Sequence, residues 1–235
     1  MTNEICTDCS VRHQSLCGSL DDVALVRFNR IGRRRRLEPG ESISWAGGES
    51  LVCGNVLSGV LKLSSSTTDG REQIVGLLFP ADFFGRPYSD ATDFSISALT
   101  EAEICLFPRG PFEQLIGEHA AMERALLKRT LLALDEARLR MVMLSRQSAE
   151  VKLAAFLLDM ASRVQSNACR ASVDGPLTFD LPLTRGQIAD VLGLTIETVS
   201  RQMTKFKAAG ILALPTVRGV TVRDWVALRA KAQIA

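Results

Sequence analysis

The chain has 235 residues, of which 46% are hydrophobic and 23% are charged, and its formal net charge at pH 7 is +2. This composition suffices for one or two domains with ordinary cores, and its near-neutral charge means that any attraction to nucleic acid must come from local basic patches. No apolar run reaches the length of a membrane span, and the first residues carry no secretory pattern. We therefore expect a cytoplasmic chain that makes no membrane contact and keeps its thiols reduced.

The polar segment 1–20 contains Cys6, Cys9 and Cys17 in the spacing Cys-x2-Cys-x7-Cys. Clustered thiolates bind iron–sulfur clusters and zinc because sulfur is a soft, charged ligand. His13 lies inside this motif and could complete a tetrahedral zinc site. A cubane cluster needs a fourth ligand, for which the other candidates are Cys53, Cys105 and Cys169. Spacing alone does not decide between zinc and an iron–sulfur cluster.

From residue 21 to about residue 110, short apolar runs alternate with turn signals, which predicts an antiparallel sandwich or barrel. Asp69-Gly70 is the clearest hairpin turn. The expected strands are 57–63, 73–79, 94–99 and 103–107.

A long helix is expected over 111–145, with two apolar stripes. The first is a heptad seam interrupted by Arg129 and Glu136, and it consists of Met122, Ala125, Leu132, Leu139 and Met143. The second consists of Leu127, Leu131, Leu134 and Met141. Two stripes predict that one packs on the sheet domain and the other on the same helix of a homodimer partner, without indicating which does which.

Beyond an expected helix over 149–164 and a loop over 165–180, residues 183–203 predict a helix-turn-helix. Thr184 and Gln187 have the spacing of a capping box, Gly193 can end the first helix, and Thr195 can cap the second.

The second of these helices begins with polar side chains that suit base edges and phosphates of double-stranded DNA. The candidate DNA contacts are Thr195, Glu197, Thr198, Ser200, Arg201 and Lys205. The segments 211–214 and 219–222 then predict the small hairpin of a winged helix, close to the DNA backbone.

Taken together, these features resemble the FNR branch of the CRP/FNR superfamily of bacterial transcription regulators. The resemblance is carried by the cysteine segment and by the runs 57–62, 69–76, 79–82, 149–156 and 183–201. The cysteine spacing is most similar to that of FnrL-type members. The implied fold is α+β: a cluster-binding tail (1–20), an antiparallel β-roll sensor domain of the cyclic-nucleotide-binding type (21–110), a dimerisation helix (111–145) and a winged helix-turn-helix (146–235).

The resemblance also implies a ligand set, because the family's fourth cluster ligand lies shortly before the long helix, at the position of Cys105. The implied ligands of a [4Fe–4S] cluster are Cys6, Cys9, Cys17 and Cys105. Cys53 and Cys169 are then structural, and His13 is a neighbour of the cluster.

The implied function is oxygen-sensing transcription regulation, without enzymatic activity. In the family, the cluster promotes dimerisation and binding to a two-fold site with TTGAT half-sites, oxygen degrades the cluster and releases DNA, and the bound regulator contacts RNA polymerase. Glu197, Ser200 and Arg201 match the family's base-reading residues. Gly85 is followed by Arg86-Pro87-Tyr88, without the Glu and Arg that hold cyclic nucleotides in related members, so we expect no cyclic nucleotide.

Two other functions are compatible with parts of the pattern. One is a regulator of the same type that holds a structural zinc in the cysteine segment and answers a different signal. The other is an iron–sulfur electron carrier or enzyme, which the helix-turn-helix and the lack of a catalytic constellation disfavour.

Overall fold

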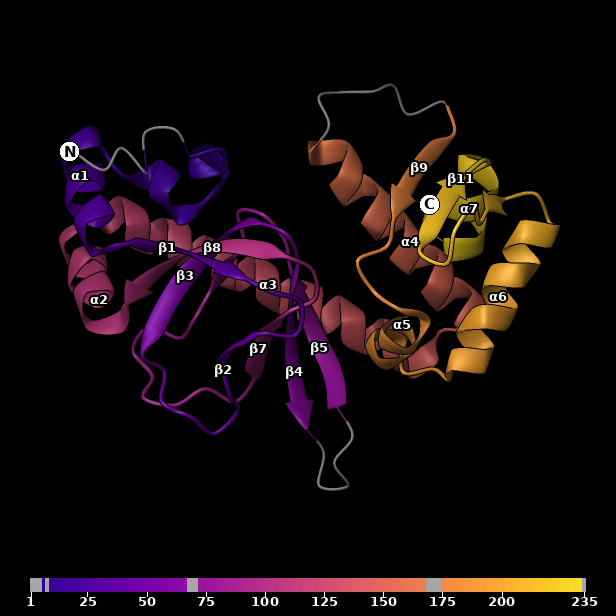
Figure 1. Ribbon diagram of the computed structural model, residues 1–235, viewed down its shortest axis with the longest axis horizontal. Helices are drawn as coiled ribbons and strands as arrows, with labels where there is room; N and C mark the ends of the chain where they lie inside the picture. The colour runs from indigo at the N-terminus through magenta and orange to yellow at the C-terminus, as the bar shows by residue number, and fades with distance from the viewer. Residues whose placement is uncertain (1–5, 7–8, 67–71, 168–174, 234–235) are drawn as a thin grey trace. The chain divides into compact units, whose positions relative to one another are not determined.

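The computed structural model describes residues 6, 9–66, 72–167 and 175–233 (Figure 1). The predicted Asp69-Gly70 turn and Cys169 lie outside the described residues. The chain divides into two compact units, Met1–Asp135 and Glu136–Ala235. Within the described ranges, no helix combines the length and apolar character needed to cross a bilayer.

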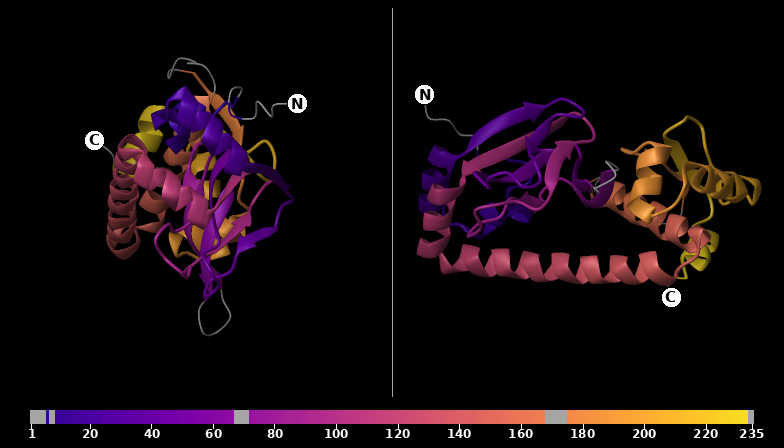
Figure 2. Two further views of the ribbon diagram at one scale, coloured as in Figure 1. Left: turned by 90° about the vertical axis from the view of Figure 1, so that its left-hand side faces the viewer. Right: turned by 90° about the horizontal axis from the view of Figure 1, so that it is seen from below.

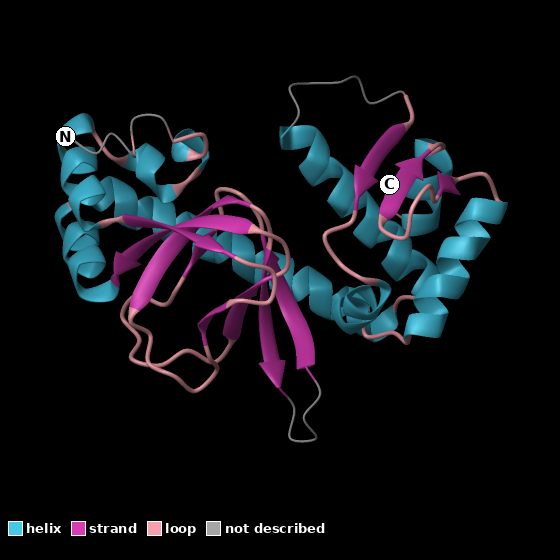
Figure 3. Cartoon of the chain, in the orientation of Figure 1, coloured by secondary structure: helices cyan, strands magenta, loops and turns pink. Residues whose placement is uncertain are grey.

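Two four-stranded antiparallel sheets form the body of the first unit, with strand orders β1-β8-β3-β6 and β2-β7-β4-β5 (Figure 3). The strands are β1 (Arg33–Leu37), β2 (Ser42–Ser44), β3 (Val52–Ser58), β4 (Leu61–Ser66), β5 (Glu72–Leu78), β6 (Phe83–Phe84), β7 (Ser95–Ala98) and β8 (Ala102–Pro108). Fully buried Leu37, Val56, Leu61 and Ile104, which come from both sheets, belong to one core. The predicted antiparallel β-roll is confirmed.

The segment 57–63, expected as one strand, contains the turn between β3 and β4 instead. Gly59 adopts φ +79°, and a Cβ at this position would lie 2.3 Å from the carbonyl oxygen of Glu101. The apolar alternation continues across the turn, so only the glycine indicated the break.

Two helices, α1 (Asp22–Ile31) and α2 (Arg109–Glu118), lie side by side at one end of the sheets (Figure 1). The sequence did not predict α1, whose first turn is capped by Asp21 accepting from the backbone N–H of Ala24 at 2.7 Å. Phe28 of α1, Phe107 of β8 and Phe112 of α2 are fully buried together.

The helix expected over 111–145 is two helices, α2 and the long α3 (Ala120–Arg146), which is drawn in full in Figure 2. His119 separates them because its backbone leaves helical geometry at φ −127°, ψ 87°. Upstream of α1, the cysteine segment forms two short 3-10 turns, η1 (Arg12–Gln14) and η2 (Leu16–Ser19).

The second unit contains the helix-turn-helix and a three-stranded antiparallel sheet of order β10-β11-β9. Its elements are α4 (Ala149–Asn167), β9 (Leu177–Asp180), α5 (Arg185–Leu192), α6 (Ile196–Ala208), β10 (Leu212–Ala213), β11 (Gly219–Val222) and α7 (Trp225–Ala232). The predicted hairpin is present as β10 and β11. Strand β9 lies where a loop was expected, and α7 was not anticipated.

Candidate functional site

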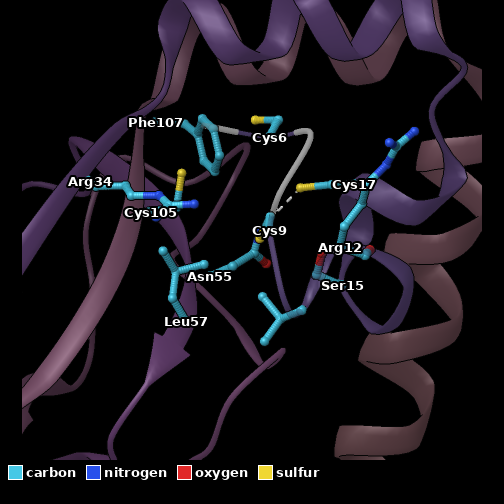
Figure 4. Close-up of a pocket in the computed structure, with 11 residues that line it drawn as sticks. Cys6, Cys9, Arg12, Ser15, Cys17, Arg34, Asn55, Leu57, Cys105 and Phe107 are labelled. Atoms are coloured by element: carbon cyan, nitrogen blue, oxygen red, sulfur yellow. Dashed lines mark hydrogen bonds between the residues drawn. The ribbon is translucent and has the colours of Figure 1, made fainter. Parts of the chain in front are cut away.

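Four cysteines line one pocket of the first unit (Figure 4). Cys6 and Cys9 precede η1, Cys17 belongs to η2, and Cys105 lies in β8, far along the chain. Leu16 and Leu20, on either side of Cys17, are buried in the hydrophobic core next to this segment. The fold therefore brings together the four cysteines that the resemblance implied as ligands.

Of the three other candidate ligands, Cys169 lies outside the described residues, and His13 and Cys53 do not line the pocket. His13 is exposed and is not among the residues that line the pocket. Cys53 is fully buried within the hydrophobic core and also stays outside the pocket lining.

Asn55 of β3 is a buried polar side chain of the pocket with 2% of its surface exposed, and Ser15 is another at 7%. Asn55 is the cross-strand partner of Cys105. Its Nδ2 donates to Sγ of Cys17 at 3.6 Å, the bond drawn as a dashed line in Figure 4. Its Oδ1 is buried and has no hydrogen-bond partner among the described residues. Sequence reasoning missed Asn55, although an amide within an otherwise apolar strand core is a usable signal.

Cations face the same pocket. Arg12 and Arg34 contribute to its lining, and Arg34 is the cross-strand partner of Cys105. A cationic lining suits a group that carries negative charge when thiolates hold it.

Burial in this pocket favours neutral thiols. Burial raises the pKa of Cys17 to about 11 and that of Cys105 to about 12, from an ordinary 9.0. Burial is also the main reason why the pKa of Cys6 is raised, with Arg34 and Arg12 acting in the opposite direction. A ligand held by these sulfurs therefore has to displace protons.

The cysteine segment is tied to α3 through Arg129. The guanidinium donates through Nη1 to the carbonyl oxygen of Ala81 at 2.8 Å and through Nη2 to that of Gln14, which lies 115 residues away in sequence. The sequence predicted Arg129 as an interruption of a dimer seam. It instead makes contacts within its own unit.

The two stripes of α3 have different surroundings. At its first turns, the heptad seam packs inward: Met122 is fully buried, and Ala125 packs on the core that contains Cys17. The second stripe is exposed throughout and consists of Leu127, Leu131, Leu134 and Met141. Leu131 lies roughly 180° around the helix from Met122. Leu132 and Leu139 of the first stripe are also exposed, so the two stripes differ in burial only at the first turns of α3.

The helix-turn-helix forms as its local sequence predicts. Thr184 and Gln187 make a reciprocal capping box at the start of α5, and Gly193 ends α5 at φ +59°. Thr195 accepts from the backbone N–H of Thr198 at the start of α6, and the two hydroxyl groups are 3.1 Å apart. Thr195 and Thr198 thus have structural roles as well as candidate roles at DNA.

The remaining candidates lie along α6, with Glu197 in its first turn and Lys205 in its last. Glu197, Arg201 and Lys205 are exposed, whereas Ser200 is half-buried. Hydrogen bonding to its backbone and to Thr195 lowers the pKa of Glu197, so this carboxylate stays ionised as an acceptor. Ile196, 53% exposed at the first position of α6, was not predicted as a candidate. An apolar side chain there suits a thymine methyl group.

Known proteins resemble this chain over most of its length. Residues 34–119 match the cyclic nucleotide-binding domain model, and residues 151–231 match the Crp-like helix-turn-helix model. A probable transcriptional activator of Rhizobium leguminosarum is 42% identical, covering 93% of this chain and 89% of that protein. The transcriptional activator FnrL of Cereibacter sphaeroides is 40% identical, covering 95% and 90%.

The structure of FixK2 from Bradyrhizobium japonicum superposes with a TM-score of 0.78 at 27% identity, covering 87% of this chain and 99% of that one. These similarities agree with the β-roll and the helix-turn-helix described above. The chain belongs to the CRP/FNR family of DNA-binding transcription regulators.

Proposed function

We propose that this regulator is an oxygen-responsive activator whose signal is a [4Fe–4S] cluster held by Cys6, Cys9, Cys17 and Cys105. The observation that carries the proposal is the convergence of these cysteines, from the N-terminal segment and from β8, on one pocket. The name of the relative FnrL supports the role of transcriptional activator.

The choice of a cluster over zinc rests on the resemblance to FNR-type regulators. The four thiols of the pocket match the ligand number of zinc and of a [4Fe–4S] cluster alike, so metal analysis decides between the two.

When bound, the cluster would supply an oxygen-labile group that cross-links the cysteine segment to β8. The chain's own residues would pass this state to α3. Fixing Cys17 would hold η1 and η2 in place, so that Gln14 can accept from Arg129. The cores around Leu16 and Met122 are continuous, which adds a second connection between the segment and the helix.

We further propose that the exposed stripe around Leu131 is the homodimer seam. Leu131 and Leu132 form a matched pair, because they are adjacent and 53% and 54% exposed. Leu131→Ser should weaken dimerisation, measured by sedimentation of cluster-loaded protein, whereas Leu132→Ser should change it little. A larger effect of Leu132→Ser would assign the seam to the other stripe.

On DNA, Glu197, Ser200 and Arg201 of α6 are proposed to read TTGAT half-sites of a two-fold site. Lys205, Thr195 and Thr198 lie on the same helix or at its cap and would contact the backbone. Activation would follow from contact between the bound dimer and RNA polymerase.

Anaerobic absorption spectroscopy with iron and sulfide assays tests the cluster assignment. Wild type should be brown, with a broad band near roughly 400 nm that bleaches in air. Cys105→Ala should abolish the band, and Cys53→Ala, a buried cysteine outside the pocket lining, should retain it. A colourless, air-stable wild type containing zinc would replace the proposed signal with the structural-zinc alternative.

A further inference from the structure

Asn55 is placed against two of the proposed cluster ligands that come from different parts of the chain. It faces Cys105 across the β3–β8 pairing. It also donates to Cys17, 38 residues away in sequence, at 3.6 Å. The Asn55 side chain therefore connects β3 to the N-terminal cysteine segment within the pocket.

The Asn55 amide stabilises the fold less than an apolar side chain of the same shape would. It is 2% exposed, and within the described residues its Oδ1 has no hydrogen-bond partner. Buried polar atoms without partners cost stability, so an amide retained at this position calls for an explanation. An iron–sulfur cluster has no hydrogen-bond donor for Oδ1, so the donor Nδ2 is the atom of Asn55 that can act on the ligand set.

We propose that Asn55 is a positioning residue for the cluster, donating a hydrogen bond to the Cys17 sulfur and so slowing the loss of the cluster in air. This inference rests on the proposed cluster function. Hydrogen bonds to cluster sulfurs favour the more reduced form and set its reduction potential. Groups that orient metal ligands in this way typically change metal affinity or activity by 10–100-fold when removed.

Replacing Asn55 by Leu distinguishes a role at the cluster from a purely structural role. A purely structural amide would lower the thermal midpoint when it is replaced. Asn55→Leu has nearly the same shape but lacks both polar atoms. In cluster-free protein its thermal midpoint should be unchanged or higher, because an unpaired polar group is removed. After anaerobic reconstitution with iron and sulfide, its absorbance should bleach in air about 10-fold faster than that of wild type. Its reduction potential should be lower.

A control in the same unit is Ser50→Ala. Ser50 is also buried and donates to the carbonyl oxygen of Arg86 at 3.2 Å, away from the pocket. This variant should lower the thermal midpoint and leave the bleaching rate unchanged.

Three results would overturn the inference. The first is that wild type is brown and the Asn55→Leu variant bleaches at the wild-type rate with an unchanged reduction potential. This result would leave the cluster proposal standing. Another is a colourless wild type, which removes both. If Asn55→Leu does not fold, Asn55→Ala removes the donor without adding bulk or a charge. Faster bleaching than in wild type is again expected for this variant. A wild-type bleaching rate would be the third result that overturns the inference.

Discussion

The cysteine pocket and the helix-turn-helix are assembled in opposite ways. The capping bonds of α5 and α6 join residues close in sequence, Thr184 with Gln187 and Thr195 with Thr198, although Lys152 also donates to the carbonyl oxygen of Leu192 from 40 residues away. The pocket joins Cys17, Asn55 and Cys105 and leaves an amide oxygen unpaired and its thiols protonated. The capping of the helix-turn-helix is therefore decided by short-range bonds, whereas the pocket depends on residues that lie far apart in the sequence.

The largest effect expected from breaking the helix-turn-helix is at Arg201. It is exposed on α6, and a good base contact contributes about 1–3 kcal/mol, acting twice in a dimer on a two-fold site. Arg201→Ala should weaken cognate binding and relax one base position in each half-site, measured by titration of cognate and mismatched duplexes. Unchanged affinities for both duplexes would remove Arg201 from the interface.

Next in size is the link between the pocket and α3. Arg129→Leu removes two charge-assisted hydrogen bonds, to Gln14 and Ala81, and each is worth roughly 1.5–3 kcal/mol. The dimer dissociation constants of cluster-loaded and cluster-free protein should therefore become more alike, and Arg129→Lys should fall in between. If the two dissociation constants of Arg129→Leu differed as much as those of wild type, the signal would reach α3 through the hydrophobic core alone.

The raised pKa values of the Cys17 and Cys105 thiols predict that protein prepared without iron loses stability at alkaline pH. Because the folded pKa is about 11 for Cys17 and about 12 for Cys105, their stabilising contribution is complete below pH 9 and is lost as pH rises towards these values. Between pH 8 and pH 10, urea unfolding should show wild type losing about 1 kcal/mol per thiol more than a Cys17→Ala/Cys105→Ala variant. Equal losses would contradict buried neutral thiols.

The smallest effect concerns the cap of α5. Thr184→Ala removes the acceptor for the Gln187 backbone N–H and should lower the free energy of unfolding by about 1 kcal/mol. Cluster content should not change, because the pocket contains no residue of this unit. A change in the absorption spectrum would contradict the independence of the two regions.

The same contrast explains what could be predicted from the sequence. The caps, Gly193 and the β10–β11 hairpin follow from short-range rules, and the sequence alone predicts them correctly. Apolar alternation predicts the sheets but misses the turn at Gly59, since alternation on both sides of a tight turn reads as one strand. It also misses α1, whose Asp21 cap lies just after the cysteine segment.

The contacts of Asn55 and Arg129 are long-range and have no sequence periodicity to indicate them. Likewise, the choice between the two stripes of α3 depends on what packs against Met122, which the sequence of the helix does not contain. The role of Cys105 was implied by family resemblance and not by spacing. The folded chain adds one observation to that resemblance, which is that Cys105 lines the pocket.

The burial of Leu16 and Leu20 around Cys17 has a consequence for how tightly the segment can grip a metal group. Bringing distant ligands together normally costs loop-closure entropy. Here the hydrophobic core closes the loop between Cys17 and Cys105 before any ligand arrives, so the thiols meet at a high effective concentration. A peptide of the first twenty residues lacks this advantage and should bind iron far more weakly than the folded chain.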